Sequence, residues 1–533
     1  MLKFKKKKIK RITFHPITMF IILTLLVMIL SSVLSFFQVQ ASYSKVNSLY
    51  KLESEAATVE GLFNIDGFKY LISNAARNFV SFTPLSTLLI GLIGVSVAHA
   101  SGLIDSLIKR KTLKIKNRTL TFLIIFVATI SSIINEVGYV ILIPLSALIF
   151  LANGRNPLLG IVASFCGVAF GYGVTLFAGS MEMNLVPITE KAAMTVDIGF
   201  HVSLLSNLIA IIISTIAVSF VGTYIIENIV SKKVGRYHLN SDSNIIGTET
   251  REIKLDAVEE EQQKRLEEEI KEKKGFRNAL IAFIVFVLMI SYMLIPNLPG
   301  SGLLLDMNEK AYIYQLFGEN AYFQEGFTFL ISVMFLVVGL AYGIGAKTFE
   351  SDKDLIEKAS FYLKDVGFLS ALVFFAAQFI AIFKKSNIGT LIVAFLSNVI
   401  EKLPFSGLPL LIAVLVLMAI SGFFVTTQSA KWTIFAPAVV RLLMQNNISP
   451  QFAQFIFRAS DSMLKGFTPL LAYFVIYLGY LNVYNTEKEP VTIKKAMTYV
   501  APYCLVISIT WILIIALIYI TGISIGPGIS PVL

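Results

Sequence analysis

The chain has little charge for its length. Charged residues make up 15% of its 533 residues, whereas about 25% is usual for a soluble protein. Hydrophobic residues make up 56%, and the mean hydropathy is +0.75. Because so few charged side chains could not cover a soluble domain of this size, the composition excludes an ordinary soluble protein.

Cysteine and histidine are also scarce, which restricts the chemistry. The two cysteines, Cys166 and Cys504, lie in apolar runs, so they make neither a disulfide framework nor a metal site. A zinc-binding HExxH sequence and a Walker-type GxxxxGK[ST] sequence are both absent. His99 and His201 have no serine or cysteine motif of a known catalytic type beside them. We therefore expect no enzyme activity, and an intramembrane enzyme is kept only as an alternative.

Long apolar runs are what the chain has instead. A helix needs roughly 20 apolar residues to cross the hydrocarbon core of a bilayer, and several runs reach that length. We predict an all-α polytopic membrane protein. Its clearest spans are expected at residues 17–38, 79–103, 201–226, 277–296, 326–346, 365–383, 465–483 and 499–521.

Positive charge is concentrated beside the predicted spans. The net charge is +11, and basic clusters occupy residues 3–11 and 109–118. Basic residues flank membrane helices on the cytoplasmic side, so we predict a cell-membrane protein with a cytoplasmic N-terminus, 1–15, and an exterior segment, 41–78. The first apolar run is longer than a signal-peptide core and lacks a cleavage site, so we expect it to be retained. We therefore expect these basic residues to contact the lipid bilayer, and we expect no nucleic-acid partner.

A charged insert, 227–276, separates two apolar halves, 16–226 and 277–533. Its part 249–276 carries mixed charges with i,i+4 pairs, which is typical of an exposed helix. We predict that the insert is cytoplasmic.

Two regions, 119–198 and 386–464, do not divide into simple spans. Glycines, prolines and polar residues interrupt their apolar runs, and pieces of about 10–14 apolar residues are typical of half-helices or re-entrant segments. Broken helices in both halves of a chain indicate the binding site of a transporter. We therefore predict re-entrant helical hairpins near 135–182 and 388–446.

Two stretches within these regions look alike, 174-VTLFAGSME-182 and 425-VTTQSAKW-432. Each joins a Val-Thr step to a small-residue turn and a polar end. They are consistent with two inverted repeats, but they are too short to establish them.

A series of longer motifs runs from about residue 80 to the C-terminus, apart from the insert. They are 83-TPLSTLLIGLIGVSVAHASGLI-104, 138-GYVILIPLSALIFLANGRNPLLGIVASFCGV-168, 351-SDKDLIEKASFYLKDVGFLSALVFFAAQFIAIFKKSNIGT-390, 429-SAKWTIFAP-437, 457-FRASDSMLKGFTPL-470 and 525-IGPGI-529. These motifs resemble those of the AbgT family, the p-aminobenzoyl-glutamate transporters.

The resemblance implies a secondary transporter of the inner membrane, usually a homodimer, with nine spans and two re-entrant hairpins. Its substrate would be a small-molecule carboxylate, because members import p-aminobenzoyl-glutamate or export sulfonamide-type antimetabolites, coupled to an ion gradient. A transporter of another carboxylate, such as a dicarboxylate or a peptide-like acid, is the alternative. The direction of transport and the coupling ion, Na⁺ or H⁺, stay open.

The resemblance places the SAKW motif in the substrate pocket. There Trp432 could stack on an aryl group, although a membrane tryptophan is otherwise an anchor at the interface. Lys431 is assigned no role, because its side chain can equally extend to water. The candidate substrate-binding residues are Glu182, Ser429, Trp432, Pro450 and Arg458.

Arg458 and Asp461 are spaced i,i+3, so on a helix they share a face and can interact. Charges inside a membrane usually face a cavity and pair. The resemblance places Arg458 in the pocket, where it could bind a carboxylate bidentately, and Asp461 beside the cation site. The alternatives are that the two residues neutralise each other, or that the segment 457–462 is a loop outside the membrane, as Pro450 and the polar stretch 445–451 would allow.

Five positions depart from the family's usual pattern. Glu182 stands where the family usually has an aspartate, and Asn135 and Glu136 are similar to the family in character only. Thr175 and Gly422 stand where family members commonly present an asparagine. That amide oxygen would suit Na⁺, which prefers oxygen ligands.

The candidate coupling residues are therefore Thr175, Gly422 and Asp461. Thr175 still offers a hydroxyl, whereas Gly422 offers only its carbonyl group. Either a Na⁺ site is rebuilt from the hairpin residues 426–428, or protons are carried by Glu182 and Asp461.

Overall fold

The computed structural model describes residues 14–111, 115–134, 137–235, 237, 258–318, 320–361, 363–364 and 366–533. Most of the basic N-terminal segment, the middle of the charged insert (238–257) and the pair Asn135 and Glu136 lie outside these residues.

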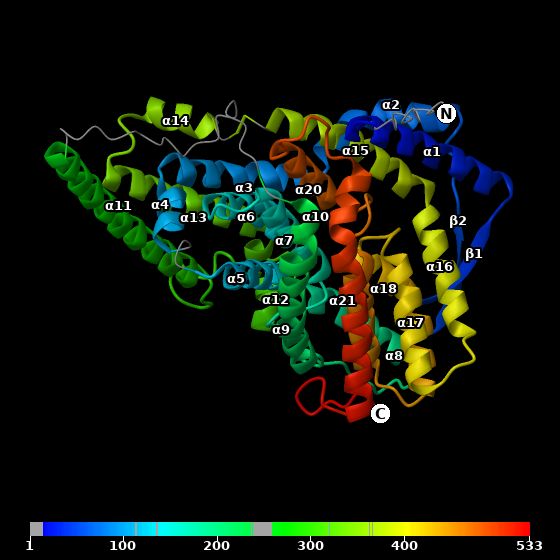
Figure 1. Ribbon diagram of the computed structural model, residues 1–533. Coiled ribbons are helices and arrows are strands. Elements are labelled where there is room, and N and C mark those ends of the chain that lie inside the picture. Colours follow the sequence, from blue (N-terminus) through cyan, green and yellow to red (C-terminus); the bar gives the residue numbers. More distant parts are fainter. Residues whose placement is uncertain are drawn as a thin grey trace, which may run out of the picture.

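Helices make up most of the described chain, and Figure 1 shows their arrangement. The first half contains α1 (Pro16–Phe36), β1 (Gln40–Val46), β2 (Leu52–Thr58), α2 (Ile65–Val80), α3 (Thr83–Ala100), α4 (Leu103–Lys111), α5 (Asn117–Ile130), the 3₁₀ helix η2 (Ser131–Ile134), α6 (Val137–Ala152), α7 (Pro157–Phe170), α8 (Ser180–Ala193), α9 (Leu208–Ile225), the π-helix η3 (Ile226–Val230) and α10 (Ser231–Val234). The second half contains α11 (Val258–Met293), α12 (Tyr312–Phe317), α13 (Tyr322–Ala346), α14 (Asp352–Phe361), α15 (Val366–Ser386), α16 (Ile388–Glu401), α17 (Gly407–Ser421), α18 (Gln428–Gln445), α19 (Pro450–Leu464), α20 (Ala472–Val483) and α21 (Ile493–Thr521).

Long apolar helices confirm the predicted class of polytopic α-helical membrane protein. Within the described ranges, seven helical stretches are long and apolar enough to cross a membrane. They are Pro16–Phe36, Ile65–Ala100, Leu208–Val234, Glu267–Met293, Tyr322–Ala346, Val366–Ser386 and Ile493–Thr521. The count of nine spans, and the re-entrant path of the shorter helices, stay predictions.

The predicted span at 465–483 is wrong. Helix α20 begins only at Ala472, and residues 465–471 form turns. This stretch contains Pro469, which cannot donate to an intrahelical hydrogen bond, and the permissive Gly466. A break therefore replaces the first part of the expected span.

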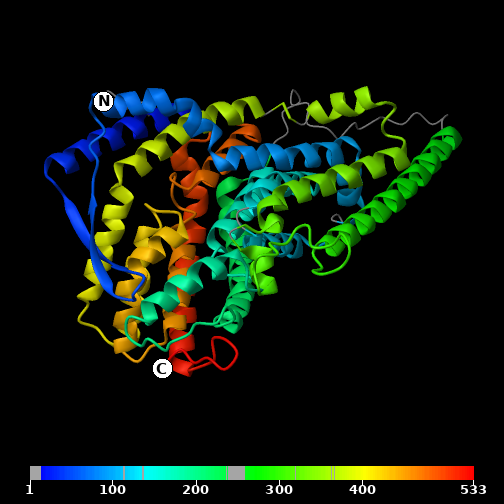
Figure 2. The same cartoon turned by 180° about the vertical axis from the view of Figure 1, so that it is seen from behind.

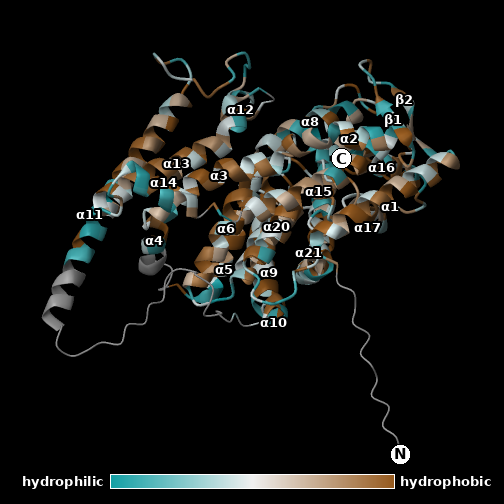
Figure 3. Ribbon diagram, turned by 90° about the horizontal axis from the view of Figure 1, so that it is seen from above, coloured by the Kyte–Doolittle hydropathy of each residue, from teal (hydrophilic) through white to brown (hydrophobic). Residues whose placement is uncertain are grey.

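The end of the charged insert continues into a span as a single helix. Helix α11 runs from Val258 to Met293, and an i,i+4 ion pair joins Glu269 to Lys273 at 2.8 Å. Figure 3 shows hydrophilic residues along its described early part and hydrophobic residues toward its end. The helical prediction for the insert is thus confirmed over 258–276.

A two-stranded hairpin is an addition to the expected all-α fold. Strands β1 and β2 pair antiparallel, from Gln40 with Thr58 to Val46 with Leu52. The hairpin packs against α16 and α18, and Asn398 of α16 donates a hydrogen bond to the Ser42 carbonyl oxygen at 2.7 Å. In Figures 1 and 2 the strands run from the end of α1 along α16.

The same order of elements occurs in both halves, in the units α5–α8 and α17–α20. In each unit a polar interruption separates the first two helices, and a short turn at 153–156 or 446–449 joins the second to the third. The third helix begins with a proline, Pro157 or Pro450, and a break follows it. Proline suits the first position of a helix because the backbone donor it lacks would have no partner there.

The two units pack reciprocally. Helix α8 contacts α18 and α19, and its counterpart α20 contacts α6 and α7. In this order the break 171–179 corresponds to 465–471, and the interruption 422–427 corresponds to the one between α5 and α6. The similar stretches 174–182 and 425–432 therefore do not occupy equivalent positions, and the repeat is carried by element order instead.

Candidate substrate and ion site

Buried charges gather where α8, α18 and α19 meet. Helix α8 begins directly after the break 171–179, and α18 begins directly after the break 422–427. Helix α8 begins at Ser180, and the carboxylate of Glu182 accepts a hydrogen bond from the Gly179 N–H at 2.8 Å. This contact satisfies a backbone donor that would otherwise have no partner at the helix start. The local need for a cap therefore fixes the position of Glu182.

Arg458 of α19 forms an ion pair with Glu182 of α8. The Nε of Arg458 also donates to the carbonyl oxygen of Gly173, in the break before α8, at 2.9 Å. Arg458 has no exposed surface, and Glu182 has almost none. Among the described residues, Nη2 of Arg458 has no hydrogen-bond acceptor. This nitrogen is thus left available for an anionic group.

Gly173 lies between this arginine and the next turn of α19. Its N–H donates to the Ser462 hydroxyl at 2.7 Å, and its carbonyl oxygen accepts from Arg458. A Cβ atom at Gly173 would overlap the Ser462 hydroxyl and the Arg458 carbonyl oxygen. The backbone can approach α19 this closely only because the residue is a glycine.

Lys431 of α18 forms an ion pair with Asp461 of α19, and both side chains are buried. The sequence assigns no role to Lys431, because a lysine near a predicted hairpin can equally extend to water. The structure places it inside the protein. Asp461, a predicted coupling residue, is therefore paired with a specific residue of the neighbouring helix.

Trp432 is fully buried beside this pair. Its ring stacks on Phe457 with centroids 4.6 Å apart and an interplanar angle of 25°. Its indole Nε1 donates to the Thr189 hydroxyl of α8 at 2.8 Å, and that hydroxyl donates to Gln454 at 2.6 Å. Trp432 thus lies in the protein interior, which contradicts the alternative of an interface anchor.

Arg458 and Asp461 lie on a buried helix, so the alternative that they lie in a loop is wrong. Every residue from Pro450 to Met463 is buried within α19. The two charges do not serve mainly to neutralise each other, since each has a partner on another helix.

Pro450 and Ser429 are the two other candidate substrate-binding residues. Pro450 is the first residue of α19, capped by the Ser449 hydroxyl, and lies more than two turns before Arg458. Ser429 lies in the first turn of α18, half-buried, where its carbonyl oxygen accepts from Thr433 at 2.8 Å. The structure gives Pro450 a role in starting the helix and does not bring it to the charges.

The candidate cation ligands lie at different breaks. Thr175 is in the break before α8, where its hydroxyl donates to the Phe177 carbonyl oxygen at 2.5 Å. Gly422 follows the last residue of α17, and a Cβ atom placed on it would lie 3.6 Å from Nζ of Lys431. Within the described ranges, no group of three or more His, Cys, Asp or Glu side chains could hold a metal ion.

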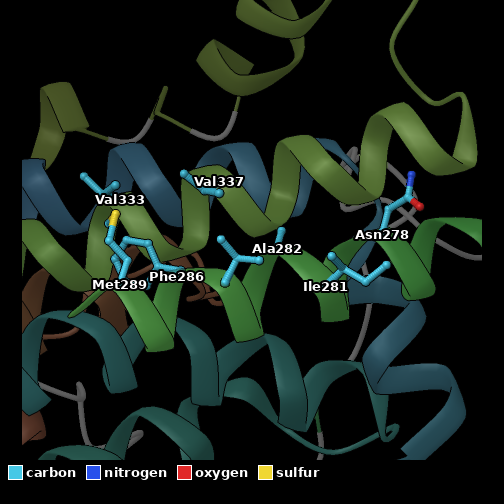
Figure 4. Close-up of a pocket in the computed structure, with 8 residues that line it drawn as sticks. Asn278, Ile281, Ala282, Phe286, Met289, Val333 and Val337 are labelled. Atoms are coloured by element: carbon cyan, nitrogen blue, oxygen red, sulfur yellow. The ribbon is translucent and has the colours of Figure 1, made fainter. Parts of the chain in front are cut away.

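An apolar cleft lies elsewhere, between α11 and α13, as Figure 4 shows. Its lining residues are Asn278, Ile281, Ala282, Val285, Phe286, Met289, Val333 and Val337. Asn278 is the one polar side chain in this lining, so the cleft lacks the charges that a carboxylate would need. The charged cluster is therefore the better candidate site.

The comparison with family models decides the family. The model described as "AbgT putative transporter family" matches residues 7–533. The chain belongs to the AbgT family. This confirms the resemblance carried by the SAKW and FRASDS motifs.

Individual relatives of this AbgT protein are transporters. The chain is 29% identical, over 517 residues, to the p-aminobenzoyl-glutamate transport protein of Escherichia coli, covering 97% of this chain and 94% of that protein. Two solved structures are also similar. The YdaH transporter of Alcanivorax borkumensis has 25% identity and a TM-score of 0.47, with coverage of 96% of this chain and 100% of that chain. The MtrF protein of Neisseria gonorrhoeae, whose structure is presented as illuminating a class of antimetabolite efflux pumps, has 27% identity and a TM-score of 0.46, with coverage of 97% and 98%.

Proposed function

We propose that this AbgT protein is an ion-coupled secondary transporter of a small aromatic carboxylate. Its substrate is of the p-aminobenzoyl-glutamate kind, taken up into the cell, or a sulfonamide-type antimetabolite, exported from it. The protein lies in the cell membrane as a homodimer with its N-terminus in the cytoplasm. The family match and the Escherichia coli relative support the substrate class.

The observation that carries the proposal is the buried guanidinium of Arg458, which is paired with Glu182 and keeps the nitrogen Nη2 open. A guanidinium matches a carboxylate in a two-point hydrogen bond, and Nη2 lacks an acceptor among the described residues. An uncompensated buried charge is costly, so Arg458 needs an anion at all times. Glu182 supplies it when substrate is absent, and a substrate carboxylate competes with Glu182 for the same group.

An aromatic stack includes the residue before this arginine in α19. Phe457 precedes Arg458 in α19 and stacks on Trp432 of α18. A substrate that joins an aryl ring to a carboxylate would place the ring against these side chains and the carboxylate on Arg458. Because the cluster is buried, the breaks at 171–179 and 422–427 must move to admit the substrate.

Flux through proteoliposomes tests this function. Radiolabelled p-aminobenzoyl-glutamate should accumulate when a Na⁺ or proton gradient is imposed and should not accumulate without one. Absence of gradient-dependent flux for this compound and for related acids would contradict the proposal. Competition by a panel of acids distinguishes the alternative, since a dicarboxylate transporter would be inhibited by succinate-like acids and not by aromatic ones.

A further inference from the structure

The ion pair of Lys431 and Asp461 lies where a coupling cation would be expected. Half-helix C-terminal ends and unwound carbonyl groups coordinate cations in transporters with broken helices. Here α17 ends at Ser421, and Gly422 begins the interruption before α18. A Cβ atom on Gly422 would lie 3.7 Å from Oδ1 of Asp461 and 3.1 Å from the Ala419 carbonyl oxygen. A carboxylate and the negative end of a helix therefore meet at this point.

The ammonium group of Lys431 already occupies that position. Its Nζ is paired with Oδ1 of Asp461 and lies 3.6 Å from where a Cβ atom on Gly422 would be. The side chain of Lys431 is 1% exposed, and that of Asp461 has no exposed surface, so water does not screen the pair. The positive group lies near the C-terminal end of α17, where a cation is favoured.

The oxygen atoms that Na⁺ would need are also engaged. The last carbonyl groups of α17 accept hydrogen bonds from the chain that follows, as from the Gly422 N–H to Ala419 at 2.9 Å and from the Val425 N–H to Ser421 at 2.9 Å. At the other break, the Thr175 hydroxyl donates to Phe177, and its carbonyl oxygen accepts from the Thr215 hydroxyl at 2.9 Å. A hard cation requires several such oxygen ligands at once. While the ammonium group of Lys431 holds the Asp461 carboxylate, the residues present do not fit a Na⁺ ion there.

We infer that Lys431 is a tethered cation which takes the place of a metal ion beside Asp461, so that Na⁺ does not bind there. A lysine ammonium carries the same charge as Na⁺, but it stays attached to the protein throughout the transport cycle. The inference rests on the proposed function only where flux is concerned, because Na⁺ binding is measured without any transport.

Removal of the lysine charge should create a Na⁺ site. In Lys431→Met, Oδ1 of Asp461 loses its partner, and Oδ2 already has none among the described residues. Neither carboxylate oxygen would then have a partner, and Oδ1 lies beside the end of α17. Since a buried unpaired charge is strongly destabilising, binding of Na⁺ would relieve it.

The experiment measures ²²Na⁺ retention and thermal unfolding of the purified full-length protein, in sodium chloride and in choline chloride of equal concentration. The wild type should retain no more ²²Na⁺ than Asp461→Asn, and its unfolding midpoint should be the same in both salts. Lys431→Met should retain up to one Na⁺ per chain and unfold at a higher temperature in sodium than in choline. Lys431→Arg, which keeps the charge, should behave like the wild type, and the neutral pair Lys431→Met with Asp461→Asn should lose the sodium response.

Two results would overturn the inference. One is ²²Na⁺ retention by the wild type that disappears in Asp461→Asn. The other is a folded Lys431→Met protein with no sodium response; if that variant does not fold, Lys431→Gln replaces it, and the wild-type comparison stands by itself. Failure of the proposed function is a separate outcome, seen as absence of substrate flux whatever the Na⁺ binding.

Discussion

Glu182 and Arg458 join helices from the two halves of the chain. Glu182 lies in the first turn of α8 and Arg458 in the middle of α19, and their ion pair is buried. The same carboxylate caps α8 through the Gly179 N–H. Glu182 thus connects the start of α8 and the break before it with Arg458, the candidate ligand of the substrate.

Glu182→Gln should destabilise the free protein and increase its response to substrate. Loss of one partner from a buried ion pair costs about 3–5 kcal/mol, because the other charge is left without compensation. A substrate carboxylate would supply the missing charge, so p-aminobenzoyl-glutamate should raise the unfolding temperature more in the variant than in the wild type. Thermal unfolding with and without ligand measures both effects.

The matched control is Glu325→Gln, since Glu325 is an exposed residue of α13. It should change neither the stability nor the ligand response. An equal ligand response in Glu182→Gln and wild type would mean that Glu182 does not compete with substrate.

Trp432 should tolerate phenylalanine far better than alanine. Phenylalanine keeps a ring against Phe457 and loses the hydrogen bond to Thr189, which should cost about 1 kcal/mol. Alanine leaves a cavity and should cost about 3–5 kcal/mol. Flux kinetics of the folded variants should show a raised KM for an aryl substrate in Trp432→Ala, and a smaller rise in Trp432→Phe.

Thr189→Val separates the hydrogen bond from the ring. This variant removes the acceptor of the indole N–H and leaves the Trp432–Phe457 stack in place. A KM raised as much by Thr189→Val as by Trp432→Ala would assign the effect to the hydrogen bond and contradict the stacking role.

Gly173→Ala should disable transport although it adds a single methyl group. The new Cβ atom would overlap the Ser462 hydroxyl and the Arg458 carbonyl oxygen, so the break would have to move away from α19. That movement would weaken the contact between Arg458 and the Gly173 carbonyl oxygen. Gly326→Ala is the control, because a Cβ atom there has no neighbour within 4 Å. Substrate flux should fall at least about tenfold in Gly173→Ala, as expected for a loss near 1.4 kcal/mol, and stay unchanged in the control. Normal flux in both variants would show that this close approach is not needed.

The membrane class and the breaks were predictable because they follow from chain composition and from local rules. Long apolar runs predict spans, and proline and glycine in a short run predict interruption, as at 171–179 and 422–427. The same rules should have divided 465–483, where Gly466 and Pro469 interrupt the run. The high apolar content of 465–483 instead favoured a single span.

The pairing of charges was not predictable in the same way, because each pair joins two helices far apart in sequence. The spacing of Arg458 and Asp461 suggested that they interact with each other, whereas their partners are Glu182 and Lys431. One signal was present for Lys431. A lysine in an apolar stretch needs an opposite charge, and the membrane helices offer few acidic residues. Gly173 and Thr189 gave no sequence signal, since their roles depend on contacts across the two units.

The central claim is that Arg458 binds the substrate carboxylate, and direct binding tests it most closely. The measurement is the affinity of purified protein for p-aminobenzoyl-glutamate, in the wild type and in a double variant, Arg458→Gln with Glu182→Gln. The double variant leaves neither charge unpaired, so it should remain folded while lacking the guanidinium. Truncation of one partner in a buried charged contact costs about 2–5 kcal/mol, so binding should weaken about 30-fold or more. Wild-type affinity in the folded double variant would contradict the account.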